Sequence, residues 1–368
     1  MILKRRPVLP ASQTPMYSNM AYQLLAYAVE NITGQAFPAM VEENLIKPLR
    51  LTRTFLSPPL NDTDAVTVDG WTIDLGGEAP YVQPVFFFAL SLQADSVPMD
   101  LGSAGGYVQS VTDLSQMGRS ILNSTLLPKL ITREWLKPVS HTSSPSMSVG
   151  RPWEILRQKV PAAPSSNATR LVDVYSKDGG IGQYASMLNL SPDHQMGISI
   201  LAGGPAATLL NAALQEAAIT TWLPAAEHAA REQAHTNLAA TYSSRDNSSA
   251  EVTLLPDEPG LFLASLVSNG TDMFDSVRRA LGEEAAPGFG GWLYPTTLVG
   301  SGGGRAAFRA VYGGVGRPAG EPCLSWVGLD QVRYGGHAAD LLIFRLGEDG
   351  KATAVEIPIL QKTLIRAG

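Results

Sequence analysis

The chain has 368 residues, which is too long for one ordinary domain and suits two. Hydrophobic residues make up 45% of it and charged residues 16%, a globular composition rather than a disordered or fibrous one. The formal net charge is −6 and no Lys/Arg run extends beyond residues 4–6, so we expect no nucleic-acid partner. No apolar run approaches the ~18–20 residues of a membrane-spanning helix.

The cysteine and histidine content argues against a metal site. Cys323 is the only cysteine, which excludes an internal disulfide framework and a cysteine-based metal cluster. The five histidines show no ligand spacing such as His-Glu-x-x-His. We therefore expect neither a metal nor another cofactor.

Asn-x-Ser/Thr triplets are frequent, and seven of the eleven asparagines begin one. The triplets start at Asn31, Asn61, Asn123, Asn167, Asn189, Asn247 and Asn269. Roughly one or two would be expected by chance, so the pattern predicts a secreted glycoprotein, with accidental triplets on a Ser/Thr-rich surface as the alternative. Asn189 is the weakest candidate because it lies in a predicted strand. The segment after Met1 has basic residues but no apolar core, so the chain as given shows no signal peptide, and we expect a lost N-terminus.

Helical periodicity is clearest in the first part of the chain. The helices predicted from apolar spacing and stop signals span residues 19–33, 37–46, 110–122 and 206–222. Gly34 should close the first helix because glycine tolerates the left-handed conformation, and the second should stop before Pro48. In the third, Ser110 and Asp113 could form a capping box. The residues predicted to line its buried face are Leu114, Met117 and Ile121.

Loops and strands alternate in the remainder. Residues 55–100 and 138–169 are predicted to be loops, and a loop as long as the first is usually functional. Strands separated by Gly-rich or Pro-Asp turns are predicted at 171–176, 183–190 and 196–202. Later short strands are predicted at 251–255, 261–267, 306–311, 339–346 and 354–360, with a hairpin turn at 348–351.

These patterns predict an α+β protein with two domains. Residues 1–223 would form an antiparallel sheet with helices, and 224–237 a polar, helical linker. Residues 238–368 would form a small β-rich domain, either a barrel or a sandwich.

Two short elements could carry chemistry. Tyr17-Ser18-Asn19 precedes the first helix, and Lys177-Asp178-Gly179-Gly180 lies between two predicted strands. Each has an ordinary alternative: Asn19 is a good helix N-cap, and Asp178-Gly179 is a typical hairpin turn beside a solvated lysine. Taken singly, neither element indicates a site.

Together and in this order they resemble serine β-lactamases and penicillin-binding proteins. Those enzymes use Ser-x-x-Lys, then Ser-x-Asn or Tyr-x-Asn, then Lys-Thr/Ser-Gly. The likeness continues in Pro48-Leu49-Arg50-Leu51, in Ser103-Ala104-Gly105-Gly106-Tyr107 and, within the C-terminal domain, in Pro259-Gly260-Leu261. The chain is thus similar to fungal β-lactamase-like proteins of the Tyr-x-Asn branch over most of its length, which implies a β-lactamase/transpeptidase-like domain with a C-terminal appendage.

The resemblance implies roles for these residues. Tyr17 would be a general base or proton relay poised by the Lys177 ammonium, which favours the phenolate. Asn19 would hold a substrate amide and a lysine. The substrate-binding residues would be Asp178, Gly179, Gly180 and Gln183, with the Gly180 position supplying an oxyanion donor. Asp178 replaces the usual small hydroxyl and would repel an anionic substrate carboxylate, so β-lactam turnover is not expected.

The nucleophile motif is missing, since Ser is never three residues before Lys. A truncated gene model or fragment, a pseudoenzyme, and complementation by another chain or by another serine such as Ser103 are the explanations left open. The function is therefore either a serine hydrolase or acyltransferase acting on an ester, amide or lactone, or a non-catalytic scaffold that binds a small ligand or another chain. In the resembled family the nucleophile motif lies on a buried helix upstream of the Tyr motif. The absence of that helix would uncover apolar surface, so we expect self-association.

Overall fold

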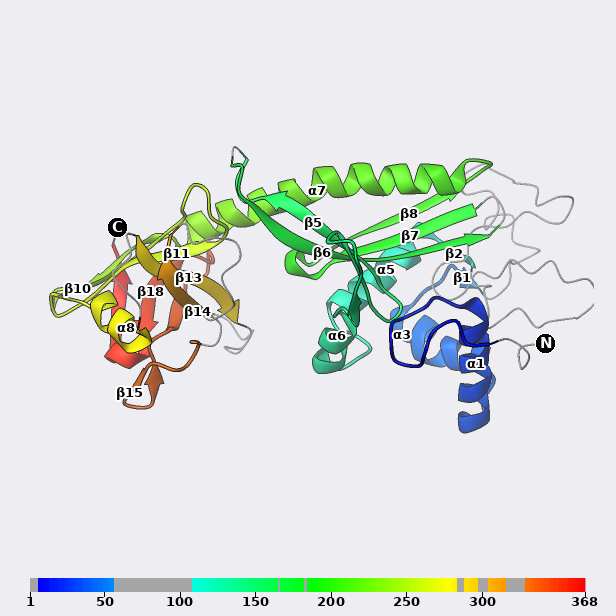
Figure 1. The fold of residues 1–368 in the computed structure, drawn as a ribbon, viewed down its shortest axis with the longest axis horizontal. Helices are drawn as coiled ribbons and strands as arrows, with labels where there is room; N and C mark the ends of the chain where they lie inside the picture. The colour runs from blue at the N-terminus through cyan, green and yellow to red at the C-terminus, as the bar shows by residue number, and fades with distance from the viewer. Residues whose placement is uncertain are drawn as a thin grey trace, which may run out of the picture. The chain divides into compact units, whose positions relative to one another are not determined.

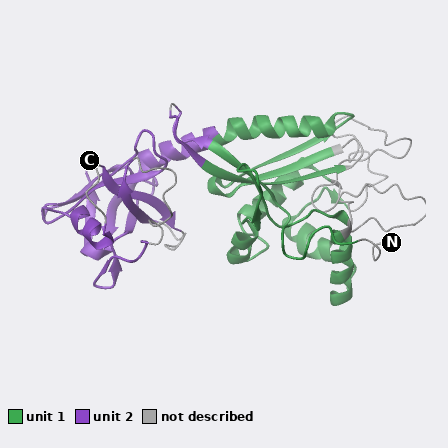
Figure 2. Cartoon of the chain, in the orientation of Figure 1, with its two compact units in different colours: residues 1–159, 171–223 green, residues 160–170, 224–368 purple. Residues whose placement is uncertain are grey.

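The structure is a computed structural model, and its described residues form two compact units. The described residues are 6–55, 108–164, 166–181, 184–282, 288–296, 304–315 and 328–367. Unit 1 comprises Met1–Lys159 and Leu171–Leu223, and unit 2 comprises Val160–Arg170 and Pro224–Gly368 (Figure 2). All but the first residue of the long loop predicted at 55–100 lies outside the described residues.

Unit 1 is built on a six-stranded sheet of order β3-β4-β5-β6-β7-β8 (Figure 1). The strands are β3 Ser140–His141, β4 Met147–Val149, β5 Glu154–Pro161, β6 Thr169–Ile181, β7 Tyr184–Ser191 and β8 Met196–Gly203. The three strands predicted between 171 and 202 are confirmed, although the first is longer. The loop predicted at 138–169 is wrong, because β3, β4 and β5 lie there. Half of the β5 residues are polar and they do not alternate with the apolar ones, so the segment lacks the pattern that identifies a strand.

The predicted first helix is confirmed as α1 (Asn19–Thr33), and Gly34 closes it with φ 70°. Its N-cap is Ser18 rather than Asn19, because the Ser18 side chain accepts a hydrogen bond from the Ala21 amide at 3.2 Å. The second predicted helix is α2 (Phe37–Val41), followed by a wider π turn (Glu42–Ile46) and α3 (Lys47–Leu49). It therefore continues through Pro48, which occupies the first turn of α3, where proline needs no amide donor.

Helix α5 (Val111–Leu122) packs on β7 and β8 and carries the predicted buried stripe. The core on this face of the sheet consists of Leu114, Met117, Ile121, Trp153, Ile155, Tyr175, Leu188 and Leu190. Ser110 caps the helix as predicted, at 3.2 Å from the Asp113 amide. The reciprocal half of the capping box is wrong, because the Asp113 carboxylate instead accepts from the Arg53 amide at 2.8 Å and the Thr54 hydroxyl at 2.9 Å. The α6 helix (Lys129–Trp135) was not predicted.

The opposite face of the sheet is covered by the unit 1 part of α7, a helix of 32 residues that spans Ala207–Leu238 (Figure 1). The helix predicted at 206–222 and the helical linker predicted at 224–237 are one element, because Pro224 lies inside the helix without ending it. Among the described residues, neither α7 nor any other helix combines the length and apolarity needed to cross a membrane.

Unit 2 contains a closed eight-stranded barrel, which decides between the barrel and the sandwich. The barrel order is β10-β9-β19-β18-β17-β14-β13-β11, and pairing of β11 with β10 closes it. Its strands are β9 Ala240–Ser244, β10 Ser248–Thr253, β11 Leu261–Ser268, β13 Phe289–Thr296, β14 Arg305–Gly314, β17 Leu341–Leu346, β18 Ala352–Ile357 and β19 Lys362–Arg366. The five predicted strands and the 348–351 turn are confirmed with shifted ends, whereas β9, β13, β19 and α8 (Phe274–Leu281) were not predicted.

The barrel should lose stability in alkali because of Tyr242. This side chain is fully buried, its hydroxyl donates to the Leu238 carbonyl at 2.6 Å, and burial raises its pKa to about 12 although Arg366 lowers it. A raised pKa means that the unfolded phenol ionises first, so the contribution is intact below about pH 10 and is lost as the pH rises to about 12. Between about pH 10 and pH 12, the free energy of unfolding should therefore fall by roughly 2–3 kcal/mol less in Tyr242→Phe than in the unsubstituted protein. Denaturant unfolding at a series of pH values measures the difference. An unchanged alkaline slope would contradict this.

Candidate functional site

The Lys177-Asp178-Gly179 segment lies inside β6. Lys177 is opposite Leu188, and Gly179 is opposite Ser186 on β7. The alternative of a hairpin turn at Asp178-Gly179 is therefore wrong, because β6 continues to Ile181 before the chain reverses. Gly180 pairs with Ala185, and Gln183 lies outside the described residues.

Tyr17 and Lys177, which are far apart in sequence, lie side by side. The Lys177 Nζ is 4.9 Å from the centroid of the Tyr17 ring. The Tyr17 hydroxyl donates to Asn19 Oδ1 at 2.5 Å, which fixes the amide beside the phenol. Ser18, between them, starts α1, so the helix N-terminus sets the position of both side chains. The structure thus brings together the three residues assigned catalytic roles from the resemblance.

The Lys177 ammonium is buried and fully hydrogen-bonded. Only 8% of the residue is exposed. Nζ donates to Glu154 Oε1 at 3.2 Å, to Asp178 Oδ1 at 2.9 Å and to the Asp178 carbonyl at 2.9 Å. A lysine ammonium has three N–H donors, so these three acceptors use all of them.

Two residues near Lys177 were missed by the sequence analysis. Glu154 is the first residue of β5, in a segment that had been predicted to be a loop. Tyr22 lies one turn into α1, and its ring centroid is 6.2 Å from that of Tyr17. Neither belongs to a recognisable motif, so only the paired strands and the helix geometry reveal them.

The pKa of the Tyr17 phenol is raised rather than lowered. Burial raises the pKa of Tyr17; Lys177 lowers it, but the Asp178 and Glu154 carboxylates raise it, and the net direction is upward. Lys177 favours the phenolate as expected, but its effect is smaller than that of burial, so the role of Tyr17 as a base stays a prediction. Burial alone would lower the pKa of Lys177, yet its contacts with the two carboxylates outweigh burial, so the ammonium is retained. The site accordingly holds a protonated phenol beside a paired ammonium.

One edge of β6 is open next to these groups. Strands β5 and β6 are neighbours joined by a short loop, in which the Ala162 amide donates to the Ala168 carbonyl at 2.9 Å, so they run antiparallel. Since β5 begins at Glu154, β6 extends past it. Within the described residues, β5 is the neighbour of β6 on that side, so we infer that Gly179–Ile181 lie beyond its end. An unpaired strand edge of this kind is a type of surface that binds extended ligands.

The asparagine triplets differ in exposure. The exposed candidates are Asn31, Asn123, Asn167, Asn247 and Asn269. Asn189 lies in β7 with 2% exposure, and its Oδ1 accepts from Gln215 Nε2 at 2.6 Å, so the folded chain cannot be glycosylated there. Asn61 lies outside the described residues. Glycosylation and secretion stay predictions.

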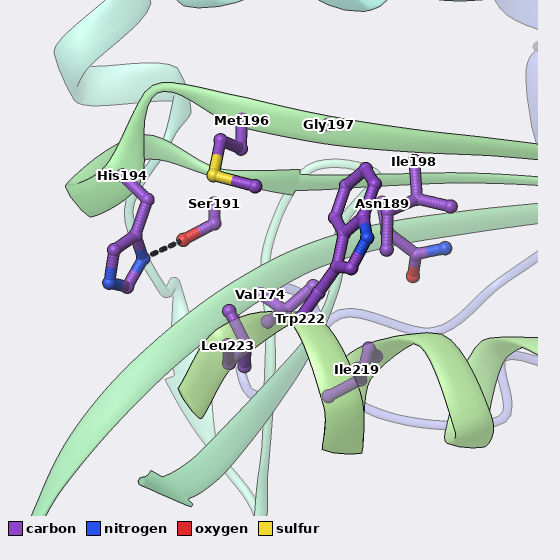
Figure 3. Close-up of a pocket in the computed structure, with 10 residues that line it drawn as sticks. All are labelled: Val174, Asn189, Ser191, His194, Met196, Gly197, Ile198, Ile219, Trp222 and Leu223. Atoms are coloured by element: carbon purple, nitrogen blue, oxygen red, sulfur yellow. Dashed lines mark hydrogen bonds between the residues drawn. The ribbon is translucent and has the colours of Figure 1, made fainter. Parts of the chain in front are cut away.

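A small pocket lies on the α7 face of the sheet (Figure 3). Lys177 is on the other face, since it pairs with Leu188 whereas the pocket is lined by the next residue, Asn189. Its lining includes Trp222, Ile198 and a Ser191–His194 pair joined by a 2.8 Å hydrogen bond. Its volume of about 20 Å³ is close to the space that one water molecule needs, so it cannot admit an acyl substrate. The Ser–His bond spans one tight turn and fastens it.

A sheet with a Lys-x-Gly strand meeting the Tyr-x-Asn start of a helix defines the class of serine β-lactamases and penicillin-binding proteins. The beta-lactamase family model matches residues 1–219, more than half of the chain, and the model described as "Beta-lactamase-like-like, C-terminal domain" matches residues 230–368. This chain belongs to the β-lactamase family.

Two of the curated relatives that the chain resembles are fungal and longer than this chain. The chain is similar to a beta-lactamase-like protein of Arthroderma benhamiae, with 28% identity covering 99% of this chain and 63% of that protein. It is also similar to the "Probable hydrolase clz13" of Cochliobolus lunatus, with 25% identity over 95% of this chain and 55% of that protein. The chain thus spans about three fifths of these relatives. An octameric penicillin-binding protein homologue from Pyrococcus abyssi aligns at 14% identity over 98% of this chain and 66% of that chain, with a TM-score of 0.40 that is too low to support any argument.

Proposed function

We propose that the chain carries the proton-relay and substrate-binding part of a β-lactamase-like serine hydrolase or acyltransferase that acts on an ester, amide or lactone. The observation that carries this proposal is the 4.9 Å contact between the Lys177 ammonium and the Tyr17 ring, beside the open edge of β6. Membership of a family of hydrolases supports the reaction class. Tyr17 would move the proton, Asn19 would bind the substrate amide, and the Gly180 backbone would donate to the oxyanion.

The raised pKa of Tyr17 indicates that this part of the site lacks a second positive charge. A general base must give up its own proton before it can accept one, and the pKa of Tyr17 is raised. A second positive charge beside the phenol would favour its anion, which the paired Lys177 does not achieve alone. In the resembled enzymes Ser-x-x-Lys supplies such a charge together with the nucleophile. No Ser-x-x-Lys occurs in these 368 residues.

The second candidate function is a non-catalytic scaffold that binds a ligand or a protein. Two observations favour it: the missing nucleophile motif and the apolar side chains that α1 leaves exposed. Leu25 is 56% exposed and Ile32 is 81% exposed. Such a surface also supports self-association, which stays a proposal.

A covalent probe separates the two functions. We expect the 368-residue polypeptide to form no adduct with a fluorophosphonate or a penicillin when its intact mass is measured. If the coding sequence upstream of Met1 supplies an in-frame Ser-x-x-Lys, the longer product should be labelled, and Tyr17→Phe should slow labelling by about 10²–10⁴-fold. Tyr27→Phe is the matched control, because Tyr27 is an exposed phenol on α1, the helix that Tyr17 precedes.

Three results would contradict the proposal. Labelling of the 368-residue chain that disappears with Ser103→Ala would show that another serine is the nucleophile. A longer, folded product that carries Ser-x-x-Lys but resists every acylating probe would favour the scaffold. Equal labelling of the Tyr17→Phe variant would remove the phenol from the mechanism.

A further inference from the structure

The hydrogen bonding of Lys177 decides what kind of charge the site can accept. Its three N–H donors already point to Glu154, the Asp178 side chain and the Asp178 carbonyl, at distances of 2.9–3.2 Å. The Tyr17 ring covers a further direction at 4.9 Å. A substrate carboxylate could bind this ammonium only by displacing one of these acceptors.

The exposed part of the cluster is negative. The side chain of Lys177 is 9% exposed, whereas those of Glu154 and Asp178 are 42% and 57% exposed. When both carboxylates are ionised, the cluster has a net charge of −1; burial raises the pKa of Glu154, and Asp178 is the more exposed of the two. An incoming molecule therefore meets carboxylate oxygens with free lone pairs before it meets the buried cation.

Aromatic rings border the same cluster. Tyr17 is 53% exposed, and the neighbouring Tyr22 ring is tilted by 50° to it. The faces of such rings attract cations, as the contact of Lys177 with Tyr17 already shows. Carboxylates and ring faces both favour a positively charged group.

We propose that the site selects acyl compounds that carry a protonated amine near the scissile carbonyl, and that Glu154 and Asp178 are the residues that determine this preference. This inference rests on the proposed function, because it assumes that the acyl group lies along the open edge of β6. The ammonium of the substrate would bind the exposed oxygens of Asp178 and Glu154. Anionic acyl compounds, which include classical β-lactams, would be repelled.

Three esters of one alcohol test the preference without requiring turnover. Glycine benzyl ester is cationic at about pH 6.5, below the α-amino pKa of about 8, whereas benzyl acetate is neutral and monobenzyl succinate is anionic. Their dissociation constants are measured from the amide NMR signals of Gly179 and Gly180 in the 368-residue chain. We expect the cationic ester to bind about tenfold more tightly than the anionic one, with benzyl acetate between them, and the difference to shrink as salt is added.

Variants assign the effect to the carboxylates. Asp178→Asn and Glu154→Gln should each raise the ratio of the cationic to the anionic dissociation constant toward one, because each removes a negative charge that favours the cation. Asp173→Asn is the matched control: this carboxylate lies on the same strand but pairs with Arg157 at 3.2 Å, so the ratio should not change. Thermal unfolding of each variant verifies that it is folded, and the unsubstituted chain alone already tests the order of the three esters.

The outcomes separate this inference from the function on which it rests. If the anionic ester shifts the Gly179 and Gly180 signals at an equal or lower concentration, the charge preference is wrong and the acyl site stands. If none of the three esters shifts these signals, the proposed function fails together with the inference. If Asp173→Asn changes the ratio as much as Asp178→Asn does, the local assignment is wrong.

Discussion

Replacing Trp153 by alanine should destabilise unit 1 by about 3–5 kcal/mol, because it removes the largest fully buried side chain of its core. Trp153 is 1% exposed. Its ring contacts Trp135 with centroids 5.2 Å apart and meets Tyr175 edge-on at 6.1 Å. The cavity left by alanine cannot close, because β5, β6 and α5 all border it. Urea unfolding followed by circular dichroism measures the loss.

The Trp153→Ala substitution should also disturb the candidate site. The next residue is Glu154, whose carboxylate holds Lys177, so a shift at the start of β5 moves an acceptor of the ammonium. Trp222→Ala is the control within unit 1, since that tryptophan is 41% exposed and should cost clearly less. Equal losses for the two variants would show that Trp153 does not anchor the core.

Gly290→Ala should cost about 3 kcal/mol or more in the stability of the barrel, at the upper end of the range for overpacking. A Cβ at Gly290 would lie 2.3 Å from Phe262 Cζ and 2.5 Å from the Leu263 carbonyl oxygen. The phenyl ring could rotate, but the carbonyl belongs to the neighbouring strand β11, which pairs with β13. Relief therefore requires the two strands to separate.

Gly291 provides the matched control in the same strand. A Cβ there would lie 3.0 Å from Ala310 Cβ and 3.2 Å from the Tyr312 ring, so a shift of a few tenths of an ångström relieves both contacts. We expect Gly291→Ala to lose less stability than Gly290→Ala in the same denaturant measurement. The reverse order would mean that the β11–β13 contact yields more easily than its hydrogen bonds suggest.

The elements that the sequence predicts best are those with a strong local signal. Helices α1 and α5 combine periodic apolar residues with a capping serine, and β7 and β8 are dense in apolar residues. The elements that were predicted wrongly lack such a local signal. Strand β5 depends on its neighbours for its conformation, and α7 continues through Pro224 because the residues on both sides favour a helix.

The site shows the same division. Tyr17 and Lys177 were found because they belong to motifs, and no periodicity would have related two residues 160 positions apart. Glu154 and Tyr22 escaped because each is ordinary in its own segment and becomes significant only in contact with Lys177 or Tyr17. The net direction of the Tyr17 pKa could not be predicted from the sequence for a related reason: desolvation depends on the surrounding atoms, and two of the neighbouring charges are negative.

The closure of the barrel has a consequence for protein engineering. Strands β9 and β19, the first and the last of the barrel, pair directly, with Arg366 opposite Tyr242. The two ends of the segment therefore leave at one seam, about 5 Å apart. A module with adjoining ends can be grafted into a surface loop of a host protein, or circularly permuted through the Glu348–Lys351 hairpin, without opening its walls.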